Sequence, residues 1–562
     1  MKLNIKSFWL WNIAILFVFF ILSIFSNSLL FDRGIPVGAD QGFHMLRIQG
    51  LTDSIKSGNW YPYINMRYLD GFGYAVDTFY SNTFLYIASF YQIFVKDNAV
   101  QAYKFLLLVI TFLTFVFAYL SAKGITQSRM ISLFASILYT LSSYHFIDTF
   151  NRAALGETIA FAFVPVVLSS FYMMVYRQKN VWYWLVVGMC ALVLSHIVST
   201  LMASTVLFVL FIVSFHSWKK NPIIVVWIGI AAIFVVGLTI FMTLPLYEQM
   251  QAQPLISQWA PVFNVPDTGV NLGDTIIHSI NNEDARSGVM NIGILVLLAP
   301  IIRLLIFEKK IVPGDYFTIS GFLTLIVCTK LFPWMLFRNT PLNAVQFPWR
   351  YMVFVTFLLA VGSAFYLGEM LKRYDKKWLV FVVFFGSVII TNVSLLYQTS
   401  FEVREPSAET ILENTANIGI GKEYLPTGVR LSDITPDSGP LYVNENVHYS
   451  NFKKNGSHIS FDYNNTNEGE IAMPIIYYKG YQAQIKENGT SMNTPVYAGV
   501  TNLATLELPK GTGTVNFYYA GTTIQKLSKI LSGVFFLAFG IVLVYEAIVR
   551  RKKVRTEKSP NE

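Results

Sequence analysis

Residues 8–47 read FWLWNIAILFVFFILSIFSNSLLFDRGIPVGADQGFHMLR. The part from 8 to 30 is an apolar run long enough to cross the roughly 30 Å hydrocarbon layer of a membrane. Beyond it, residues 38–47 carry three ionisable side chains, Asp40, His44 and Arg47. In a helix these three would share one face, whereas in an interfacial loop they would simply face water. The stretch therefore predicts a membrane helix followed by a group of polar side chains at the membrane surface.

Composition places the whole chain in the same class. Of its 562 residues, 54% are hydrophobic and only 13% are charged, which excludes an ordinary soluble protein. The net charge of +9 does not indicate nucleic acid, because Lys and Arg cluster at the ends of apolar runs, as topology signals do. Cys190 and Cys328 both lie inside apolar runs, so neither a disulfide framework nor a cysteine metal site is indicated.

Runs of membrane-spanning length predict the fold class: a polytopic all-α membrane protein with about twelve transmembrane helices and a β-domain near the C-terminus. The first run is read as a retained helix, because it is longer than a signal-peptide core and lacks a small-x-small cleavage site. The predicted spans are 8–30, 103–122, 130–147, 158–176, 181–199, 201–217, 222–244, 289–307, 315–332, 349–370, 378–397 and 525–548.

Basic clusters on alternate connections predict the topology. They indicate that both termini lie in the cytoplasm. The apolar run 78–95 would invert every later loop if it crossed, so Asp77–Phe94 is predicted as one helix on or dipping into the outer surface. The outer face then carries four loops, at 31–102, 149–157, 245–288 and 333–350.

The external segment 398–524 changes character, because apolar and polar residues alternate there. Period-two sets predict strands joined by turns at Asn488–Gly489 and Lys510–Gly511. The sets are Ile459/Phe461/Tyr463, Tyr481/Ala483/Ile485, Leu506/Leu508 and Val515/Phe517/Tyr519. The predicted division is therefore a transmembrane module over 1–397, an extracellular β-sandwich over 398–524, and a last helix with a basic cytoplasmic tail over 525–562.

Two motifs put further charges at the outer mouth of the bundle. NRAALGE carries Arg152 and Glu157, whose burial costs several kcal/mol unless they pair or bind a ligand. Pairing with each other and binding a ligand are both open readings. QFPWR places Trp349 at the interface, which is ordinary aromatic-belt chemistry, and then Arg350, which either snorkels or grips a phosphate.

His196, near the outer end of the predicted span 181–199, is a weaker candidate. A lone histidine in such a place is more often a hydrogen-bonded structural residue than a catalyst. The predicted outer face offers two carboxylates, Asp40 and Glu157. It also offers three arginines, Arg47, Arg152 and Arg350. Such a set suits an anionic lipid head group at the membrane boundary.

The reaction that needs both charges is transfer of a sugar from a lipid phosphate to a hydroxyl, with a carboxylate as base and cations on the leaving phosphate. The competing reading is a lipid or polysaccharide transporter, or a flippase component, that breaks no bond. A transporter would instead carry its charges near mid-membrane in broken helices. A third reading is a scaffold of an export complex, which needs no such chemistry.

A set of motifs in fixed order carries a family resemblance: GADQGFHMLRI, SGNWYPYI, GFGYAVDTFYSNTFLYI, NRAALGETIAFAFVPVVL, LSHIVSTLM, QFPWRYM and GKEYLP. The chain resembles bacterial membrane proteins of the 6-pyruvoyl-tetrahydropterin synthase-related family, which carry no pterin chemistry. It is also similar to the YfhO family within the GT-C glycosyltransferase superfamily. The segment PIIYYKGYQAQIKENG is similar to the C-terminal part of YfhO-type proteins.

The resemblance implies a polyprenyl-phosphate-sugar-dependent glycosyltransferase that acts on the outer face of the bacterial cell membrane. It implies Asp40 as catalytic base and Glu157 or Asp148 as a second acidic position. The positive charges of Arg152, Arg350 and Arg47 predict, from the residues themselves, that they bind the donor phosphate. His44 and His196 would shape the site.

The acceptor implied by the resemblance is a teichoic or lipoteichoic acid, another cell-wall polysaccharide or a glycolipid. Separate proteins would make and flip the donor. A divalent cation stays open as a cofactor, since the first loop carries Asp40–Gln41 rather than paired acids.

Overall fold

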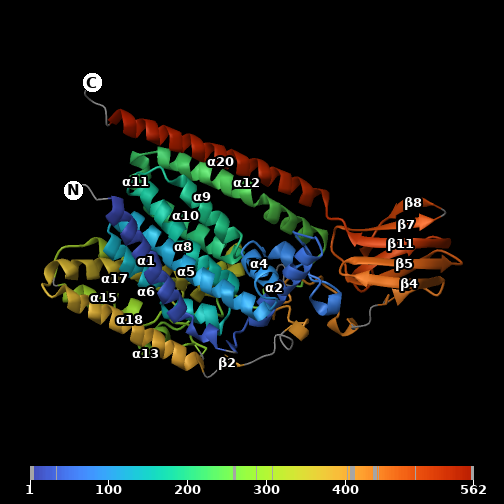
Figure 1. Ribbon diagram of the computed structural model, residues 1–562, viewed down its shortest axis with the longest axis horizontal. Helices are drawn as coiled ribbons and strands as arrows, with labels where there is room; N and C mark the ends of the chain where they lie inside the picture. Colours follow the sequence, from blue (N-terminus) through green and yellow to red (C-terminus); the bar gives the residue numbers. More distant parts are fainter. Residues whose placement is uncertain are drawn as a thin grey trace. The chain divides into compact units, whose positions relative to one another are not determined.

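The fold is taken from a computed structural model of the chain. It describes residues 5–32, 34–256, 261–285, 288–306, 308–400, 403–404, 412–434, 439–440, 442–487 and 489–557. Within these ranges the chain is mostly helical, with strands concentrated after residue 440 (Figure 1). The predicted class, a helical protein with a C-terminal β region, is confirmed at this level.

Every predicted span coincides with a helix or a pair of helices. The corresponding helices are α1 (Ile5–Ser26), α5 (Ala99–Thr126), α6 (Arg129–Thr140) with α7 (Ser143–Phe146), α8 (Leu155–Val175), α9 (Trp182–Val193), α10 (Ile197–Val213), α12 (Ile223–Ala252), α14 (Ile294–Leu297) with α15 (Ala299–Leu305), α16 (Pro313–Val327), α17 (Met352–Arg373), α18 (Lys377–Ser400) and α20 (Thr523–Glu557). In the described chain, six helices are long and apolar enough to cross a membrane, or seven if one bent pair is a single span. The number of crossings therefore stays a prediction.

The structure corrects several predicted boundaries. Asp77–Phe94 is not one helix but α3 (Val76–Phe79) and α4 (Leu85–Phe94), because Tyr80 is extended and the intervening Ser81, Asn82 and Thr83 favour turns over helix interiors. The run 289–307 forms only the short α14 and α15. Helix α12 continues through Pro245 to Ala252, so it enters the segment that we predicted as a loop.

The loops that we predicted on the outer face also contain helices that composition did not predict. Helix α2 (Gln41–Lys56) follows Asp40, and α13 (Leu272–Asn281) lies in the predicted loop 245–288. Helix α20 extends to Glu557, so the basic tail is helical over its described part. The helix α11 (Phe215–Lys220) follows α10.

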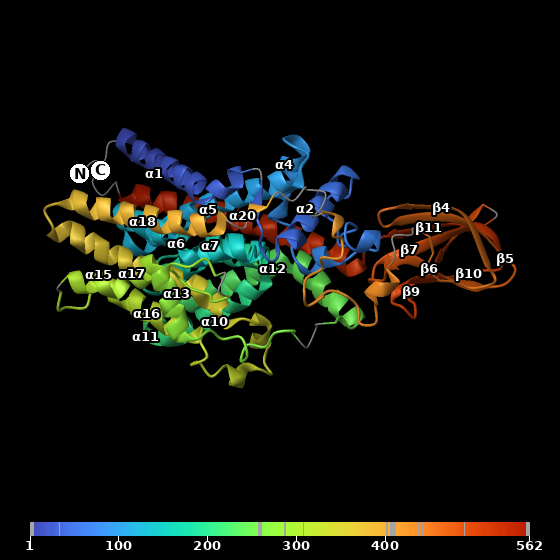
Figure 2. The same cartoon turned by 90° about the horizontal axis from the view of Figure 1, so that it is seen from below.

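The strands after residue 440 form two antiparallel sheets, seen as two layers in Figure 2. One sheet has the order β3-β6-β10-β9 and the other β4-β5-β11-β7-β8. Their bounds are β3 (Tyr442–Val443), β4 (Val447–Asn455), β5 (His458–Asn465), β6 (Gly469–Ile476), β7 (Tyr481–Glu487), β8 (Thr490–Thr494), β9 (Tyr497–Ala498), β10 (Leu503–Leu508) and β11 (Gly511–Tyr519).

The period-two pattern identified these strands correctly. The predicted sets fall in β5, β7, β10 and β11, and Ile459, Ala483 and Val515 are buried because alternate side chains of a strand point to opposite faces. The predicted turn at Lys510–Gly511 joins β10 to β11. The other predicted turn includes Asn488, which lies outside the described residues.

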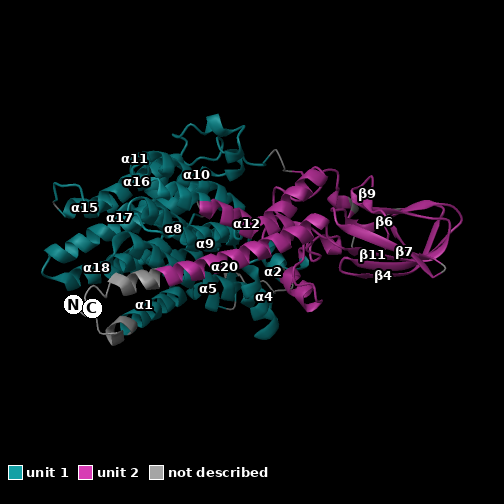
Figure 3. Cartoon of the chain, turned by 90° about the horizontal axis from the view of Figure 1, so that it is seen from above, with its two compact units in different colours: residues 1–48, 83–229, 261–413 teal, residues 49–82, 230–260, 414–562 magenta. Residues whose placement is uncertain are grey.

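Contacts divide the chain into two units that differ from the three predicted segments, coloured in Figure 3. Unit 1 is 1–48, 83–229 and 261–413, and unit 2 is 49–82, 230–260 and 414–562. The predicted division at 397 and 524 stays a prediction. In unit 1, α5 packs on α6 and α8, and α17 packs on α6 and α16. A two-stranded sheet joins β1 (Ile35–Pro36) to β2 (Val403–Arg404).

In unit 2 the end of α12 is fastened to the β region. Gln249 Nε2 donates to Lys479 O at 2.6 Å, and Gln253 Nε2 donates to Tyr477 O at 2.9 Å. Glu248 pairs with Lys479 at 3.1 Å and accepts a hydrogen bond from the Thr522 hydroxyl at 2.5 Å. These bonds hold the connection between β6 and β7, and the segment after β11, to one helix.

Candidate functional site

A broken helix carries the first half of the site. Helix α6 and the segment Ser143–Asn151 are bent by 46° relative to one another. The segment ends in a π-helical turn, Ile147–Asn151, after which Arg152 N–H donates to Ile147 O at 2.9 Å. Such turns are frequent at functional sites, because they redirect side chains out of the regular helical register. Glu157 follows in the first turn of α8.

Arg152 stands between two carboxylates. Its Nη1 donates to Asp148 Oδ1 and to Glu157 Oε2. The Asp148 side chain is fully buried and that of Glu157 is 6% exposed, against 13% for Arg152. Of the two readings that the sequence left open, pairing of Arg152 with Glu157 is therefore observed. Both acids lower the energy of the buried guanidinium and raise the pKa of Arg152 against the opposing effect of burial.

Arg350 completes a chain of charges across the site. Its Nε lies 2.9 Å from Glu157 Oε1. This contact is an ion pair without hydrogen-bond geometry, since neither atom has a hydrogen-bond partner in the described chain. Arg350 Nη1 donates to the carbonyl oxygen of Val345 at 2.8 Å, which fixes the side chain. Arg350 is therefore paired at the cluster and does not merely snorkel.

Aromatic rings lie behind both arginines. The guanidinium carbon of Arg152 is 4.4 Å from the centre of a Trp349 ring, and that of Arg350 is 5.0 Å from the Phe347 ring. At these distances the rings attract the cations. Trp349 is only 8% exposed, so its predicted role in an interfacial belt is wrong. The ring instead supports a charge of the site.

Both arginines keep donors for a ligand. In the part of the chain that the structure describes, Nη2 of Arg152 and Nη2 of Arg350 donate no hydrogen bond. The two side chains are 13% and 12% exposed. The cluster therefore retains guanidinium N–H groups that can donate to an anion.

Backbone bonds bring Asp40 to this cluster. Ala39 N–H donates to Asn151 O at 3.1 Å, and Asp40 N–H donates to Arg152 O at 2.9 Å. The close approach requires glycine at position 38, because a Cβ there would lie 2.4 Å from Ala153 Cβ. Asp40 directly precedes α2, whose N-terminal dipole favours a nearby carboxylate.

The Asp40 carboxylate is exposed and makes no hydrogen bond or ion pair with any described residue. Although its residue is exposed, the protein around the carboxyl raises its pKa, and the charges of Arg152 and Arg350 oppose this rise. The two arginines are thus near enough to act on Asp40 electrostatically. Asp40 is a carboxylate without a partner beside a neutralised ion cluster.

His44 and Arg47 lie deeper than Asp40, in α2. They are 2% and 1% exposed, and Arg47 Nη1 lies 3.5 Å from His44 Nδ1. Burial, followed by the charge of Arg47, lowers the pKa of His44, so this ring is neutral at pH 7. Asp40 therefore does not share the buried face of His44 and Arg47, and the predicted contact of Arg47 with phosphate stays a prediction.

His196 caps helix α10. Its Nδ1 accepts a hydrogen bond from Ser199 N–H at 3.3 Å and lies 2.8 Å from Ser199 Oγ. The ring lies within electrostatic range of Glu157. The structural role considered from the sequence is thus observed, and a part in shaping the site stays a prediction.

The cluster does not fit a divalent cation. Among the described residues, no group of three or more His, Cys, Asp or Glu side chains could hold a metal ion. The two carboxylates nearest to one another, Asp148 and Glu157, are bridged by Arg152 where a cation would stand.

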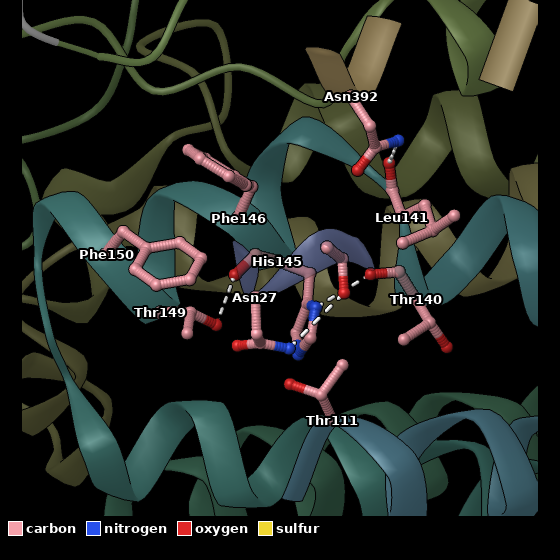
Figure 4. A pocket seen from close by; sticks show the side chains of 10 residues that line it. Asn27, Thr111, Thr140, Leu141, His145, Phe146, Thr149, Phe150 and Asn392 are labelled. Carbon is pink, nitrogen blue, oxygen red and sulfur yellow. Dashed lines mark hydrogen bonds between the residues drawn. The ribbon is translucent and has the colours of Figure 1, made fainter. Parts of the chain in front are cut away.

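A small polar cavity lies beside the broken helix (Figure 4). The volume in which the centre of a water molecule fits is about 10 Å³. Three buried polar atoms that line it, Asn27 Oδ1, Thr140 Oγ1 and His145 Nε2, have no hydrogen-bond partner in the described chain. Thr149 Oγ1 donates to His145 O at 2.7 Å, so this cavity adjoins the turn that carries Asp148.

Comparison with known proteins identifies the family. The model of the family described as "6-pyruvoyl-tetrahydropterin synthase related domain; membrane protein" matches residues 78–401. The chain belongs to this family. This 6-pyruvoyl-tetrahydropterin synthase-related family is the one that the motifs indicated, and the matched range holds Asp148, Arg152, Glu157 and Arg350 but begins after Asp40.

A relative of this family member is an uncharacterized protein of Lactococcus lactis subsp. cremoris strain MG1363. The two are 22% identical over an alignment that covers 98% of each chain.

Two solved structures also resemble the chain. One is the oligosaccharyltransferase AglB from Archaeoglobus fulgidus in complex with an inhibitory peptide and a dolichol-phosphate, at 12% identity, a TM-score of 0.37, and coverage of 72% of this chain and 56% of AglB. The other is ArnT from Cupriavidus metallidurans bound to undecaprenyl phosphate, at 11% identity, a TM-score of 0.38, and coverage of 71% and 77%. These likenesses are too weak to establish a shared fold.

The structure brings together most of the predicted site. Asp40, Arg152, Glu157 and Arg350 lie in one cluster, and Asp148, the alternative second acid, joins it. Sequence reasoning missed the ring of Trp349, although its place next to Arg350 in QFPWR was a usable signal. The catalytic and phosphate-binding roles of these residues stay predictions.

Proposed function

We propose that the protein is a membrane glycosyltransferase that moves a sugar from a polyprenyl-phosphate donor to a hydroxyl of an acceptor outside the cytoplasm. The observation that carries this proposal is the exposed Asp40 carboxylate, held by a backbone bond beside Arg152 and near Arg350. A base without a partner next to two cations is what transfer from a phosphate requires.

In the proposed reaction the acceptor hydroxyl oxygen attacks the anomeric carbon of the donor sugar. The bond between that carbon and the phosphate oxygen breaks, and the phosphate leaves with the electron pair. Arg152 and Arg350 stabilise its charge through their N–H groups. The hydroxyl proton passes to the ionised carboxylate of Asp40.

Asp40 is preferred to Glu157 as the base. Both oxygens of Glu157 face an arginine, and its side chain is 6% exposed, whereas Asp40 is exposed and has no partner in the described chain. In the proposal Glu157 pairs with the two arginines. It is the second acidic position that the resemblance implies. Arg47, His44 and His196 support the site from α2 and the α10 cap.

The finer parts of the proposal come from the resemblance. The acceptor is a teichoic or lipoteichoic acid, another cell-wall polysaccharide or a glycolipid, and separate proteins supply and flip the donor. The proposed orientation, in a bacterial cell membrane, has both termini in the cytoplasm and the site outside. Single cysteines at Ser128 and Ser217 should then stay unlabelled by an impermeant maleimide on intact cells, and labelling of either would refute the orientation.

One experiment separates the enzyme from the alternatives. Purified protein in nanodiscs receives a labelled polyprenyl-phosphate sugar with and without a cell-wall glycopolymer. The enzyme releases polyprenyl phosphate only when acceptor is present. A transporter or flippase component would move lipid or glycan without releasing it, and a scaffold would do neither. Release by wild type but not by Asp40→Asn supports the assigned site.

A further inference from the structure

The Glu157 carboxylate spans the two arginines of the site. Oε2 accepts a hydrogen bond from Arg152 Nη1, and Oε1 lies 2.9 Å from Arg350 Nε. A ring lies behind each guanidinium, Trp349 behind one and Phe347 behind the other. One anionic group with two oxygens thus bridges two guanidinium groups that come from different segments of the chain.

A phosphate group has the same requirements. Like a carboxylate, it presents negatively charged oxygens that bind guanidinium N–H groups. The contact between Glu157 Oε1 and Arg350 Nε lacks hydrogen-bond geometry. A group with tetrahedrally arranged oxygens could satisfy a donor that the flat carboxylate leaves unsatisfied.

Because the charges of the cluster are balanced, a phosphate cannot simply bind in addition to the carboxylates that are already there. Arg152 and Arg350 are balanced by Asp148 and Glu157, and Asp40 adds a further negative charge nearby. An additional anion in a mostly buried, neutral cluster would be costly. One carboxylate must therefore give way.

Of the two carboxylates, Glu157 is the one that can move aside. Asp148 is fully buried in the π-helical turn, and of the two arginines it pairs only with Arg152. Glu157 is 6% exposed, contacts both arginines and lies in the first turn of α8. Its displacement would free both cations together.

We infer that the Glu157 carboxylate stands where the phosphate of the ligand binds, and that a phosphate ester displaces it. This inference rests on the proposed function, because the polyprenyl-phosphate donor supplies the phosphate. Glu157 then sets the affinity for donor and for released polyprenyl phosphate. It competes with the ligand and keeps the arginines paired until the ligand arrives.

The test measures binding of undecaprenyl phosphate to the full-length protein in nanodiscs, without acceptor. Glu157→Gln keeps the size of the side chain and removes its charge, so its hold on the arginines weakens. Since a charge-assisted hydrogen bond is roughly twice as strong as a neutral one, binding should tighten by about tenfold. Asp148→Asn is the matched control, because it removes the same charge beside Arg152 without vacating the bridging position.

Undecaprenol, which lacks the phosphate, is the second probe and should bind equally to wild type and both variants. Inorganic phosphate is the third probe. If it does not compete with undecaprenyl phosphate, and undecaprenyl phosphate binds Glu157→Gln more tightly than wild type, the ligand is a lipid-borne phosphate. If inorganic phosphate binds tightly and Glu157→Gln strengthens that binding, the displacement of Glu157 by phosphate stands. The inference that the phosphate comes from a lipid is then overturned. Thermal unfolding verifies that both variants are folded.

Unchanged or weaker binding of undecaprenyl phosphate by Glu157→Gln, with normal binding by wild type, overturns the inference and leaves the proposed function standing. Equal tightening by Asp148→Asn overturns it as well, since a general charge effect would then suffice. If wild type, Glu157→Gln and Asp148→Asn all fail to bind undecaprenyl phosphate, the proposed function fails and the inference falls with it.

Discussion

The guanidinium carbon of Arg152 lies 4.4 Å from the centre of a Trp349 ring. Arg152 comes from the junction after the π-helical turn, and Trp349 from the 3₁₀ turn Pro348–Tyr351 that precedes α17. The indole thus lies behind a cation whose other partners, Asp148 and Glu157, come from its own neighbourhood in the sequence. The ring therefore adds a cation–π contact between two segments that are far apart in the sequence.

Trp349→Leu should weaken this support. A partly buried cation–π contact contributes about 1–2 kcal/mol, so the variant should unfold at a lower temperature and bind undecaprenyl phosphate less tightly. Trp349→Phe retains an aromatic face and should recover part of both losses. Thermal unfolding and lipid binding in nanodiscs measure the effects. Equal behaviour of the Leu and Phe variants would argue that bulk alone matters.

Asp40→Asn should reduce sugar transfer by roughly 10²–10⁴-fold, because a positioned general base supplies about this much rate. The side chain is exposed, so stability should change by no more than about 0.5 kcal/mol. Single-turnover transfer with labelled donor measures the rate, and binding of undecaprenyl phosphate serves as the control. A well-folded variant with the wild-type rate would remove Asp40 as the base.

The pH dependence of transfer should report the same carboxyl. Although the residue is exposed, the protein around its carboxyl partly desolvates it and raises the pKa of Asp40, and Arg152 and Arg350 oppose this rise. The base must be ionised, so the rate should be full above this raised pKa and should fall as the pH drops through it. In Arg350→Ala one opposing charge is lost, and the acid limb should move to higher pH. The limb should be absent in Asp40→Asn, and an unmoved limb in Arg350→Ala would count against the assignment.

Arg152→Ala should destabilise the protein more than Arg350→Ala. Loss of Arg152 leaves Asp148 and Glu157 mostly buried without their shared cation, and removal of one partner of a buried pair costs about 3–5 kcal/mol. Loss of Arg350 leaves Glu157 its bond to Arg152. Thermal unfolding in detergent compares the two, and Arg152→Ala combined with Asp148→Asn should regain stability. Identical unfolding temperatures for the two single variants would contradict the expectation.

The outer face of the five-stranded sheet should contribute to acceptor use. Ser460, Asn516 and Gln484 stand opposite one another across β5, β11 and β7, and none makes a side-chain hydrogen bond within the described residues. Gln484→Ala with Asn516→Ala should raise the KM for a glycopolymer acceptor and leave donor binding unchanged. Asn467→Ala, in the connection between β5 and β6, is the matched control. Unchanged KM in the double variant would assign this face no part in binding acceptor.

Point variants are preferable to removing the sandwich. Replacement of 400–522 by a linker would take Lys479 and Thr522 away from Glu248, which is 8% exposed. The deletion would thus leave a buried carboxylate unpaired at the end of α12, and a loss of activity would not report acceptor binding.

Periodicity predicted most elements because it depends on nearby residues only. Apolar runs marked the positions of the helices, and alternation marked the strands, for example Val515 and Phe517 in β11. The breaks were harder to predict. The bend between α6 and α7 and the gap at Tyr80 fall at short polar stretches, Ser142–Ser143 and Ser81–Thr83, within longer apolar runs, so the hydropathy of a whole run gives little sign of either.

The residues of the candidate site were predicted one by one, but the ion pairs between them were not. Asp40, Arg152, Glu157 and Arg350 stood out as charges next to apolar runs. Their partners depend on tertiary packing, since Glu157 and Arg350 lie on distant segments of the chain. Asp148 fell just beyond a predicted span, and its role in neutralising Arg152 became visible only in the π-helical turn.

The bare position at Gly38 has a consequence for how this site can vary. Since the chain there lies against Ala153, and Asp40 N–H bonds to Arg152 O, the spacing between the acid and the cation is set by main-chain atoms. The side chain at position 40 can then be exchanged without altering the backbone that presents it, whereas Arg152 is tied to Asp148 and Glu157. We therefore expect relatives that keep the glycine to vary at position 40, and a side chain at position 38 to push the acid away from the cation.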